Sequence, residues 1–213
     1  MRSPNYPPSP ARATNLPWFP ALSPHLLDGF VLEEEDELMN APEIITDRLM
    51  MRRHLIDDFD TSLAMWSDPA VTRYIGGRSS TAEEVWSRLL RYVGHWELLG
   101  YGYWVVVDRA SQRFAGEVGF ADFRREINPP LDAPEAGWVL ASWAAGNGLA
   151  TEAMIAALRW ADAALLPART VCMIAPGNAA SLRVAEKVGY RLHAKAEYKG
   201  SEVVLYDRTA DRV

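Results

Sequence analysis

The spacing of apolar residues becomes regular from about residue 43 onwards, and it predicts alternating strands and helices. The clearest helix begins at Thr81-Ala82-Glu83-Glu84, a capping box in which Thr81 bonds forward and Glu84 bonds back. It should run to about Leu98, where two glycines follow. Its buried stripe is predicted to contain Val85, Leu89, Leu90, Val93 and Trp96.

Short apolar runs separated by turn residues predict the other elements. The predicted strands are residues 45–53, 103–107, 114–123, 135–142, 170–174, 190–197 and 202–206. The predicted helices are residues 57–67, 81–98, 149–165 and 178–188, and the proline-rich residues 124–134 form a loop. The order β-α-α-β-β-β-α-β-α-β-β predicts a mixed sheet flanked by helices, in the α/β or α+β class.

Residues 1–40 differ in composition from the rest of the chain. Seven of the 14 prolines lie in the first 24 residues, and an acidic run follows at 33–37. Proline lacks a backbone donor and like charges repel, so this stretch should not build a core of its own. We therefore expect a Pro-rich, acidic extension at 1–40, either disordered or docked, and one folded domain at 41–213.

Composition argues against some classes of function. The net charge is −6 and the pI is about 5.3, which disfavours non-specific binding to nucleic acids and to anionic membranes. No apolar run approaches the ~20 residues of a membrane span. The four histidines show no metal-ligand spacing, and the single cysteine, Cys172, is expected to be a small buried apolar residue. These features predict a cytoplasmic protein without a metal.

A glycine-rich turn is the most informative local sequence. Residues 145–152, AGNGLATE, stand between a predicted strand and a predicted helix. Unpaired amides and the helix dipole at such a turn favour an anion, most simply a phosphate. A P-loop is excluded because Gly148 is not followed by Lys and Ser or Thr. A dinucleotide site is disfavoured because no acid ends the next strand, and a turn without any ligand is the remaining alternative.

A second motif follows about 30 residues later and changes this picture. The matching stretches are ITDRLMMR (45–52), SDPAVTRYI (67–75), EAGWVL (135–140), the glycine turn, and NAASLRVAEKVGY (178–190). In this order they resemble the GNAT superfamily of acyl-CoA-dependent N-acetyltransferases, in particular its Rim-type branch of ribosomal-protein N-terminal acetyltransferases. The resemblance covers about residues 43–208. It implies a mixed central sheet in which two parallel strands splay apart.

The resemblance implies that acetyl-CoA is the co-substrate. Its pyrophosphate would bind to the glycine turn, which comprises Ala145, Gly146, Asn147, Gly148, Leu149, Ala150 and Thr151. Its pantetheine arm would pair with the preceding strand, at Trp138, Val139 and Leu140. Asn178 and Ser181 would face the pantetheine and the sulfur, and Asn178 should also cap its helix. Family members often have Gln or Arg at the position of Ala145, so here backbone amides should supply most of the binding.

The resemblance also implies direct transfer to an amine without a metal or a covalent enzyme intermediate. Ala185 stands where many members have the tyrosine that protonates the thiolate, which leaves Ser181, one turn earlier, as the candidate general acid. An amine must lose a proton, and Glu135 is the first and Glu117 the second candidate to accept it. A strand amide would stabilise the oxyanion. Four aromatic residues either line the acceptor pocket or belong to the core: Tyr101, Tyr103, Trp104 and Trp138.

The sequence thus predicts transfer of an acetyl group from acetyl-CoA to a primary amine, on a protein N-terminus or a small molecule. Two alternatives stay open: a catalytically weak acyl-CoA-binding sensor or interaction module, and a nucleotide-binding regulator. The acceptor would be selected by residues 57–98 and 124–134, which differ among family members. A homodimer is also left open.

Overall fold

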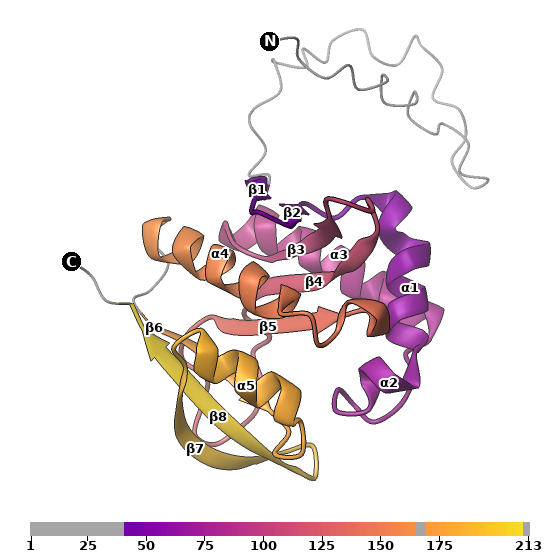
Figure 1. Cartoon of the computed structure of the whole chain (residues 1–213). Helices are drawn as coiled ribbons and strands as arrows, with labels where there is room; N and C mark the ends of the chain where they lie inside the picture. Colours follow the sequence, from indigo (N-terminus) through magenta and orange to yellow (C-terminus); the bar gives the residue numbers. More distant parts are fainter. Residues whose placement is uncertain (1–40, 165–168, 211–213) are drawn as a thin grey trace, which may run out of the picture. The chain divides into compact units, whose positions relative to one another are not determined.

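The computed structural model describes residues 41–164 and 169–210 (Figure 1). The predicted extension at 1–40 lies outside these residues, so its structure stays a prediction. No helix of the described part is both long and apolar enough to span a membrane.

Eight strands of the described residues form one mixed sheet, as predicted, in the order β1-β2-β3-β4-β5-β6-β8-β7. Every neighbouring pair is antiparallel except β5 and β6, which are parallel. The strands are β1 (Ile44–Ile45), β2 (Leu49–Arg52), β3 (Tyr103–Asp108), β4 (Phe114–Ala121), β5 (Glu135–Leu140), β6 (Arg169–Ile174), β7 (Arg191–Tyr198) and β8 (Ser201–Thr209).

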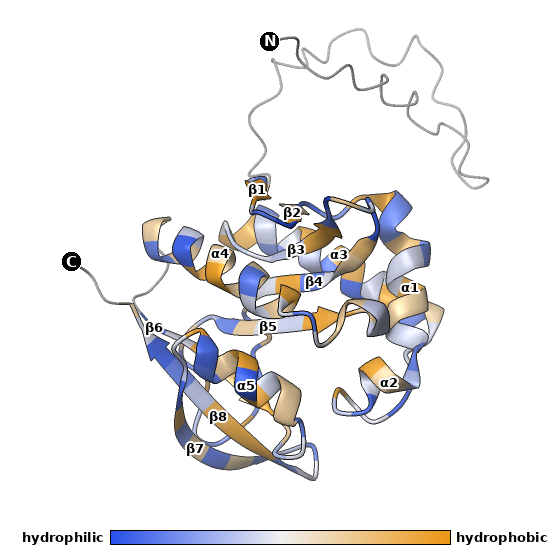
Figure 2. Ribbon diagram, viewed as in Figure 1, coloured by the Kyte–Doolittle hydropathy of each residue, from blue (hydrophilic) through white to orange (hydrophobic). Residues whose placement is uncertain are grey.

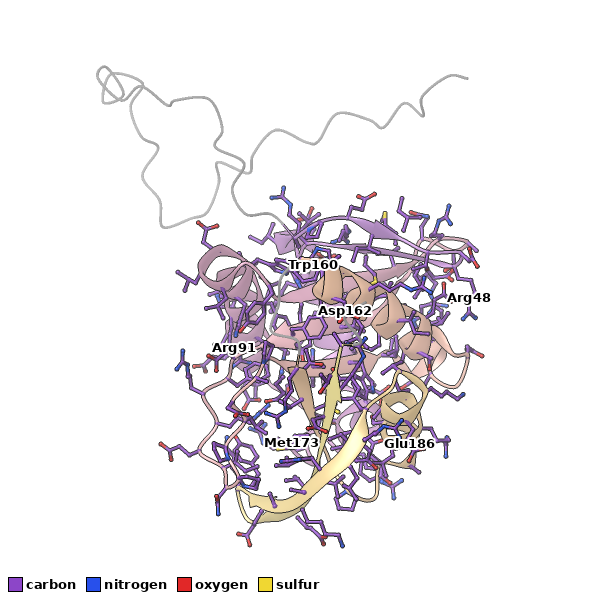
Figure 3. All side chains as sticks on the ribbon, turned by 90° about the vertical axis from the view of Figure 1, so that its left-hand side faces the viewer. Arg48, Arg91, Trp160, Asp162, Met173 and Glu186 are labelled. Atoms are coloured by element: carbon purple, nitrogen blue, oxygen red, sulfur yellow. The ribbon has the colours of Figure 1, made fainter. Side chains whose placement is uncertain are left out.

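Helices cover both faces of this sheet. In the two views, α3 lies on one face and α4 on the other, while α5 lies beside β6 and β8 (Figures 1 and 3). The helices are α1 (Phe59–Ser67), α2 (Pro69–Thr72), α3 (Ala82–Leu99), α4 (Leu149–Ala163) and α5 (Ala179–Lys187), with short 3-10 helices η2 (Ile56–Asp58) and η3 (Ser142–Ala144). The short α2 was not predicted, although Asp68 caps it and Pro69 occupies its first position.

The capping box of α3 is confirmed, but its predicted buried stripe is partly wrong. Thr81 and Glu84 exchange the two expected bonds, and Gly100 ends the helix at φ 70°. Leu90 and Val93 are exposed. The buried positions are Val85, Leu89, Tyr92, His95 and Trp96, which recur every three or four residues along one face. Large polar-tipped rings therefore fill places that we had assigned to aliphatic side chains.

The core lies where both helical layers meet the central strands. Trp96 of α3, Trp104 of β3 and Trp160 of α4 are in mutual edge-to-face contact, with ring centroids 4.7 to 5.3 Å apart. Figure 2 shows apolar residues on the central strands, whereas β7 is largely hydrophilic. Most of β7 is exposed because it is an edge strand. Trp104 is a core residue with no exposed surface, so the pocket role considered for it is wrong.

Candidate functional site

Strands β5 and β6 splay apart, as predicted. Only one pair, Glu135 with Val171, is in register, and beyond it the strands diverge (Figure 1). On its other side β5 is paired with β4 along its whole length, from Glu135 to Leu140. The edge of β5 that faces β6 therefore carries backbone groups without a strand partner. Such an edge can bind an extended ligand through main-chain hydrogen bonds.

A cleft of about 1220 Å³ opens at this divergence. Its walls come from the loop that follows α2, from α3, from β5 and β6, from the start of α5, and from the hairpin of β7 and β8. Of the predicted site residues, the cleft brings together Glu135, Trp138, Val139, Asn178 and Ser181. It does not include Leu140, the glycine turn or Glu117.

The glycine turn lies at the far end of β5, where η3 leads into α4. Gly146 and Gly148 have φ angles of 80° and 78°, a backbone conformation that side chains other than glycine rarely adopt. A Cβ at Gly146 would meet nothing within 4 Å, and residues 145–148 are exposed. Gly148 is the N-cap of α4 and offers no side-chain cap, so the first amides of the helix are open to a ligand.

Arg48 lies beside this turn, a placement that we did not predict. Its Nη1 donates to Asn147 O at 3.0 Å, and its Nη2 is 3.6 Å from the position of a Cβ on Gly148. Its Nε donates to Glu152 in the first turn of α4 at 2.6 Å, and Thr46 Oγ1 donates to the same carboxylate at 2.6 Å. The turn between β1 and β2 thus anchors the start of α4. Figure 3 shows Arg48 on the α4 side of the sheet.

The Glu152 carboxylate is ionised by these contacts. Burial alone raises the pKa of Glu152, but the hydrogen bonds from Thr46 and from the Arg48 amide and guanidinium outweigh burial and lower it. The only sequence feature that could have pointed to this contact is that Thr46 and Arg48 belong to the matching stretch at 45–52. The turn therefore has a cation beside it, although Ala145 supplies none.

Asn178 and Ser181 hold the start of α5 in the cleft. Asn178 Oδ1 accepts the Ser181 amide at 3.1 Å, which confirms the predicted N-cap. Among the described residues the Ser181 hydroxyl has no hydrogen-bond partner, and Ser181 is half-buried in the cleft wall. Ala185, one turn further along α5, is fully buried in the core. Ser181 is therefore a free hydroxyl on the helix that borders the splayed strands.

Glu135 occupies the base of the cleft, at the point where β5 and β6 are still paired. Both of its carboxylate oxygens accept from Arg125, at 2.5 and 2.9 Å, and Arg125 Nη1 donates to Tyr198 at 3.1 Å. Burial lowers the pKa of Arg125, but the bonds to Glu135 and Tyr198 outweigh burial, so Arg125 stays charged. The first candidate proton acceptor is thus in the cleft and in a bidentate ion pair.

Glu117 is fully buried behind the cleft wall. Its oxygens accept from Ser62 Oγ at 2.6 Å and from Trp66 Nε1 at 2.9 Å, and His54 Nε2 is 3.7 Å away. Burial raises the pKa of Glu117, but the His54 ring and the bonds from Ser62 and Trp66 outweigh it and hold the pKa below its usual value. Trp66 separates this carboxylate from the cleft. The structure does not bring the second candidate base to the site.

Two of the four predicted aromatic residues line the cleft, Tyr103 and Trp138. Tyr103 stacks on Tyr92 with ring centroids 4.3 Å apart, while Tyr101 packs against the core. The Trp138 Nε1 is buried and has no hydrogen-bond partner among the described residues. An unpaired buried donor is costly unless a ligand satisfies it.

These features together fit an extended ligand with a phosphate at one end. Open amides lie at the glycine turn, an unpaired strand edge leads from it, and an orphaned indole N–H and a free hydroxyl lie in the cleft. Acyl-CoA has this shape and this sequence of groups. No cluster of three or more potential metal ligands occurs within the described ranges. The fold and the site define an acyl-CoA-dependent acyltransferase.

Comparisons with known proteins give the same class. The family model of the acetyltransferase (GNAT) domain matches residues 48–191. A GNAT-family acetyltransferase from Bordetella pertussis is 34% identical and has a TM-score of 0.71, with 79% of this chain and 100% of that chain covered. The uncharacterised protein YkkB of Bacillus subtilis is 28% identical over 80% of this chain and 98% of its own length. The chain belongs to the GNAT acetyltransferase family.

A more distant solved structure is a RimL ribosomal L7/L12 alpha-N-protein acetyltransferase in complex with coenzyme A. It is 18% identical, with a TM-score of 0.65 over 80% of this chain and 98% of that chain. This likeness concerns the fold. Family membership makes the protein an acetyl-CoA-dependent N-acetyltransferase and confirms acetyl-CoA as the co-substrate. Membership of this family argues against the alternative of a nucleotide-binding regulator.

Proposed function

We propose that the protein acetylates a primary amine, on a protein N-terminus or a small molecule, by direct attack of the amine on the thioester. One observation carries this proposal: Ser181, Glu135 and the unpaired edge of β5 line a single cleft. A hydroxyl, a carboxylate and backbone donors are the groups that acyl transfer from a thioester to an amine needs.

Acetyl-CoA supplies the activated acetyl group. The amides of the glycine turn, Gly146–Thr151, would hold its pyrophosphate, with the charge of Arg48 beside them. The backbone groups of Trp138 and Leu140 would pair with the pantetheine arm, since those of Val139 between them face β4, and one amide would donate to the carbonyl oxygen as negative charge develops on it. The nitrogen–carbon bond forms, the carbon–sulfur bond breaks, and one proton must leave the nitrogen while another reaches the sulfur.

Ser181 is the proposed proton donor to the departing sulfur. Ser181→Ala is expected to lower kcat about a hundredfold, the lower end of a general-acid contribution, and to leave the Kd for CoA unchanged. Steady-state kinetics by thiol release and calorimetry with CoA measure the two quantities. Because Asn178 caps α5 through the Ser181 backbone, the variant should keep its fold. Ser181→Thr, which restores a hydroxyl, should recover most of the rate; an unaltered kcat in Ser181→Ala would remove this residue from the chemistry.

Glu135 is the proposed proton acceptor, acting on the amine directly or through water. The bidentate contact with Arg125 holds this carboxylate in the cleft. Glu135→Gln is expected to lower kcat/KM about a hundredfold at pH 7. The defect should shrink as the pH rises, because the amine then loses its proton to solvent. A pH profile from 7 to about 10 tests this, since a defect of constant size would limit Glu135 to holding Arg125.

A further inference from the structure

The α3 wall of the cleft carries two arginines, Arg88 and Arg91, at positions i and i+3 of the helix. Both line the cleft, opposite the splayed strands. Figure 3 shows Arg91 on the α3 side of the sheet, away from Arg48 and the glycine-turn side. The two arginines therefore line the cleft from the α3 side of the sheet, opposite to the side that carries the glycine turn.

Three of the other arginines that line the cleft are paired with carboxylates, whereas Arg73 lies over the Tyr74 ring. Arg78 pairs with Glu84, Arg124 with Asp122 at 2.8 Å, and Arg125 with Glu135. Neither Arg88 nor Arg91 has a carboxylate within ion-pair distance in the described ranges. Although the whole chain has a net charge of −6, Arg88 and Arg91 place on this wall two positive charges that no ion pair within the described ranges neutralises.

Arg88 is held by the Trp66 ring and by a side-chain hydrogen bond with Tyr92, and its Nε donor is left for a ligand. Its guanidinium lies 3.7 Å from the centroid of the Trp66 ring, and the Trp66 indole is in turn fixed by its bond to Glu117. Stacking uses the flat face of a guanidinium and leaves its in-plane N–H groups free. The Arg88 Nε is buried and has no hydrogen-bond partner among the described residues. A buried donor in this state is a binding element for an acceptor atom.

Arg91 is held similarly, one turn along α3. Its guanidinium lies 5.2 Å from the centroid of the Phe123 ring, at the rim of the cleft. Burial, together with the like charges of Arg88 and Arg125, lowers the pKa of Arg91. An anion between these cations would relieve their repulsion.

We propose that Arg88 and Arg91 bind a carboxylate of the acceptor, so that the enzyme prefers amines that also carry a carboxylate. This inference rests on the proposed function, because it names the class of amine that enters the same cleft. A guanidinium fork matches a carboxylate with two parallel hydrogen bonds. Polycationic amines would be repelled by the same wall. An amine and a carboxylate occur together in an amino acid or short peptide with a free carboxylate, and also in a protein N-terminus that is followed by an acidic residue.

Matched pairs of acceptors test the preference and separate the two sources. The first pair is alanylalanine and its C-terminal amide; the second is a tetrapeptide amide with aspartate or asparagine at its second position. In at least one pair the carboxylate compound should have a kcat/KM about tenfold or more above that of its neutral partner. Arg88→Gln and Arg91→Gln should abolish this advantage while leaving the neutral compounds unaffected. Arg159→Gln, the same change at an exposed position of α4, is the control and should keep the preference.

A binding measurement keeps the inference independent of turnover. Calorimetry with CoA and the N-acetylated forms of the same compounds measures carboxylate recognition without turnover. It therefore gives a result even if no amine is acetylated, which is the outcome that would contradict the proposed function. A stronger binding of the carboxylate form that is lost in Arg88→Gln supports the inference. If the carboxylate and neutral compounds of both pairs have equal kcat/KM values and equal Kd values, the inference is overturned. If thermal melting shows that Arg88→Gln is unstable, the same measurements on Arg91→Gln decide the test, because Arg91 is exposed.

Discussion

Gly116→Ala is expected to destabilise the protein by about 3 kcal/mol and to weaken CoA binding, because β4 and β5 approach too closely at Gly116 for a side chain. A Cβ there would lie 2.1 Å from the Val139 carbonyl oxygen and 2.8 Å from the Leu140 Cα. Both obstacles are backbone atoms, which cannot rotate away as a side chain can. The φ of 154° adds strain for any residue with a Cβ.

The predicted consequence reaches the site because Val139 and Leu140 belong to the strand whose other edge is open. Moving β5 to make room for a methyl group displaces the backbone donors that we assign to pantetheine. Denaturant unfolding and CoA calorimetry measure the two effects. Gly94→Ala is the matched control: Gly94 lies within α3 with nothing within 4 Å of its Cβ position, so the change should stabilise by about 1 kcal/mol. Two variants of equal stability would contradict this account.

Local features of the fold were predictable from the sequence because their causes lie within a few residues. The capping box at Thr81 and the glycine that ends α3 are both present in the structure. The wrong prediction that Leu90 and Val93 are buried also has a local cause. Counting apolar residues overlooked that Tyr92 and His95 are at the correct angular positions to be buried. Helical geometry, rather than hydrophobicity alone, decides which residues face the core.

Long-range contacts in the site were not predictable in the same way. Arg48 binds Glu152 across 104 positions of sequence, and Ser62 binds Glu117 across 55. The predicted acids Glu135 and Glu117 have the same charge and both lie on strands, yet one lines the cleft and the other is sealed behind Trp66. Only the packing of α1 against β4 creates this difference, and no spacing in the sequence encodes it.

Glu117→Gln is expected to lower the free energy of unfolding by about 3 kcal/mol at pH 7, since it leaves a buried donor without a charged acceptor. A glutamine has one acceptor oxygen, so it cannot accept from both Ser62 and Trp66 through two oxygens as the carboxylate does. The same charge change at Glu97, an exposed position on α3, should have little effect. Chemical denaturation of the three proteins measures the difference.

The effect of Glu117→Gln should depend on pH with a definite sign. The pKa of Glu117 is lowered in the fold, so its carboxylate stabilises the protein above the ordinary value of 4.5, and this stabilisation is lost as the pH falls below that value. The gap in stability between the native protein and Glu117→Gln should therefore be full at pH 7 and shrink below pH 4.5. Because Glu117 lies behind Trp66, kcat of the folded variant should change little. A large fall in kcat with unchanged stability would instead restore Glu117 as a proton acceptor and imply that Trp66 moves during turnover.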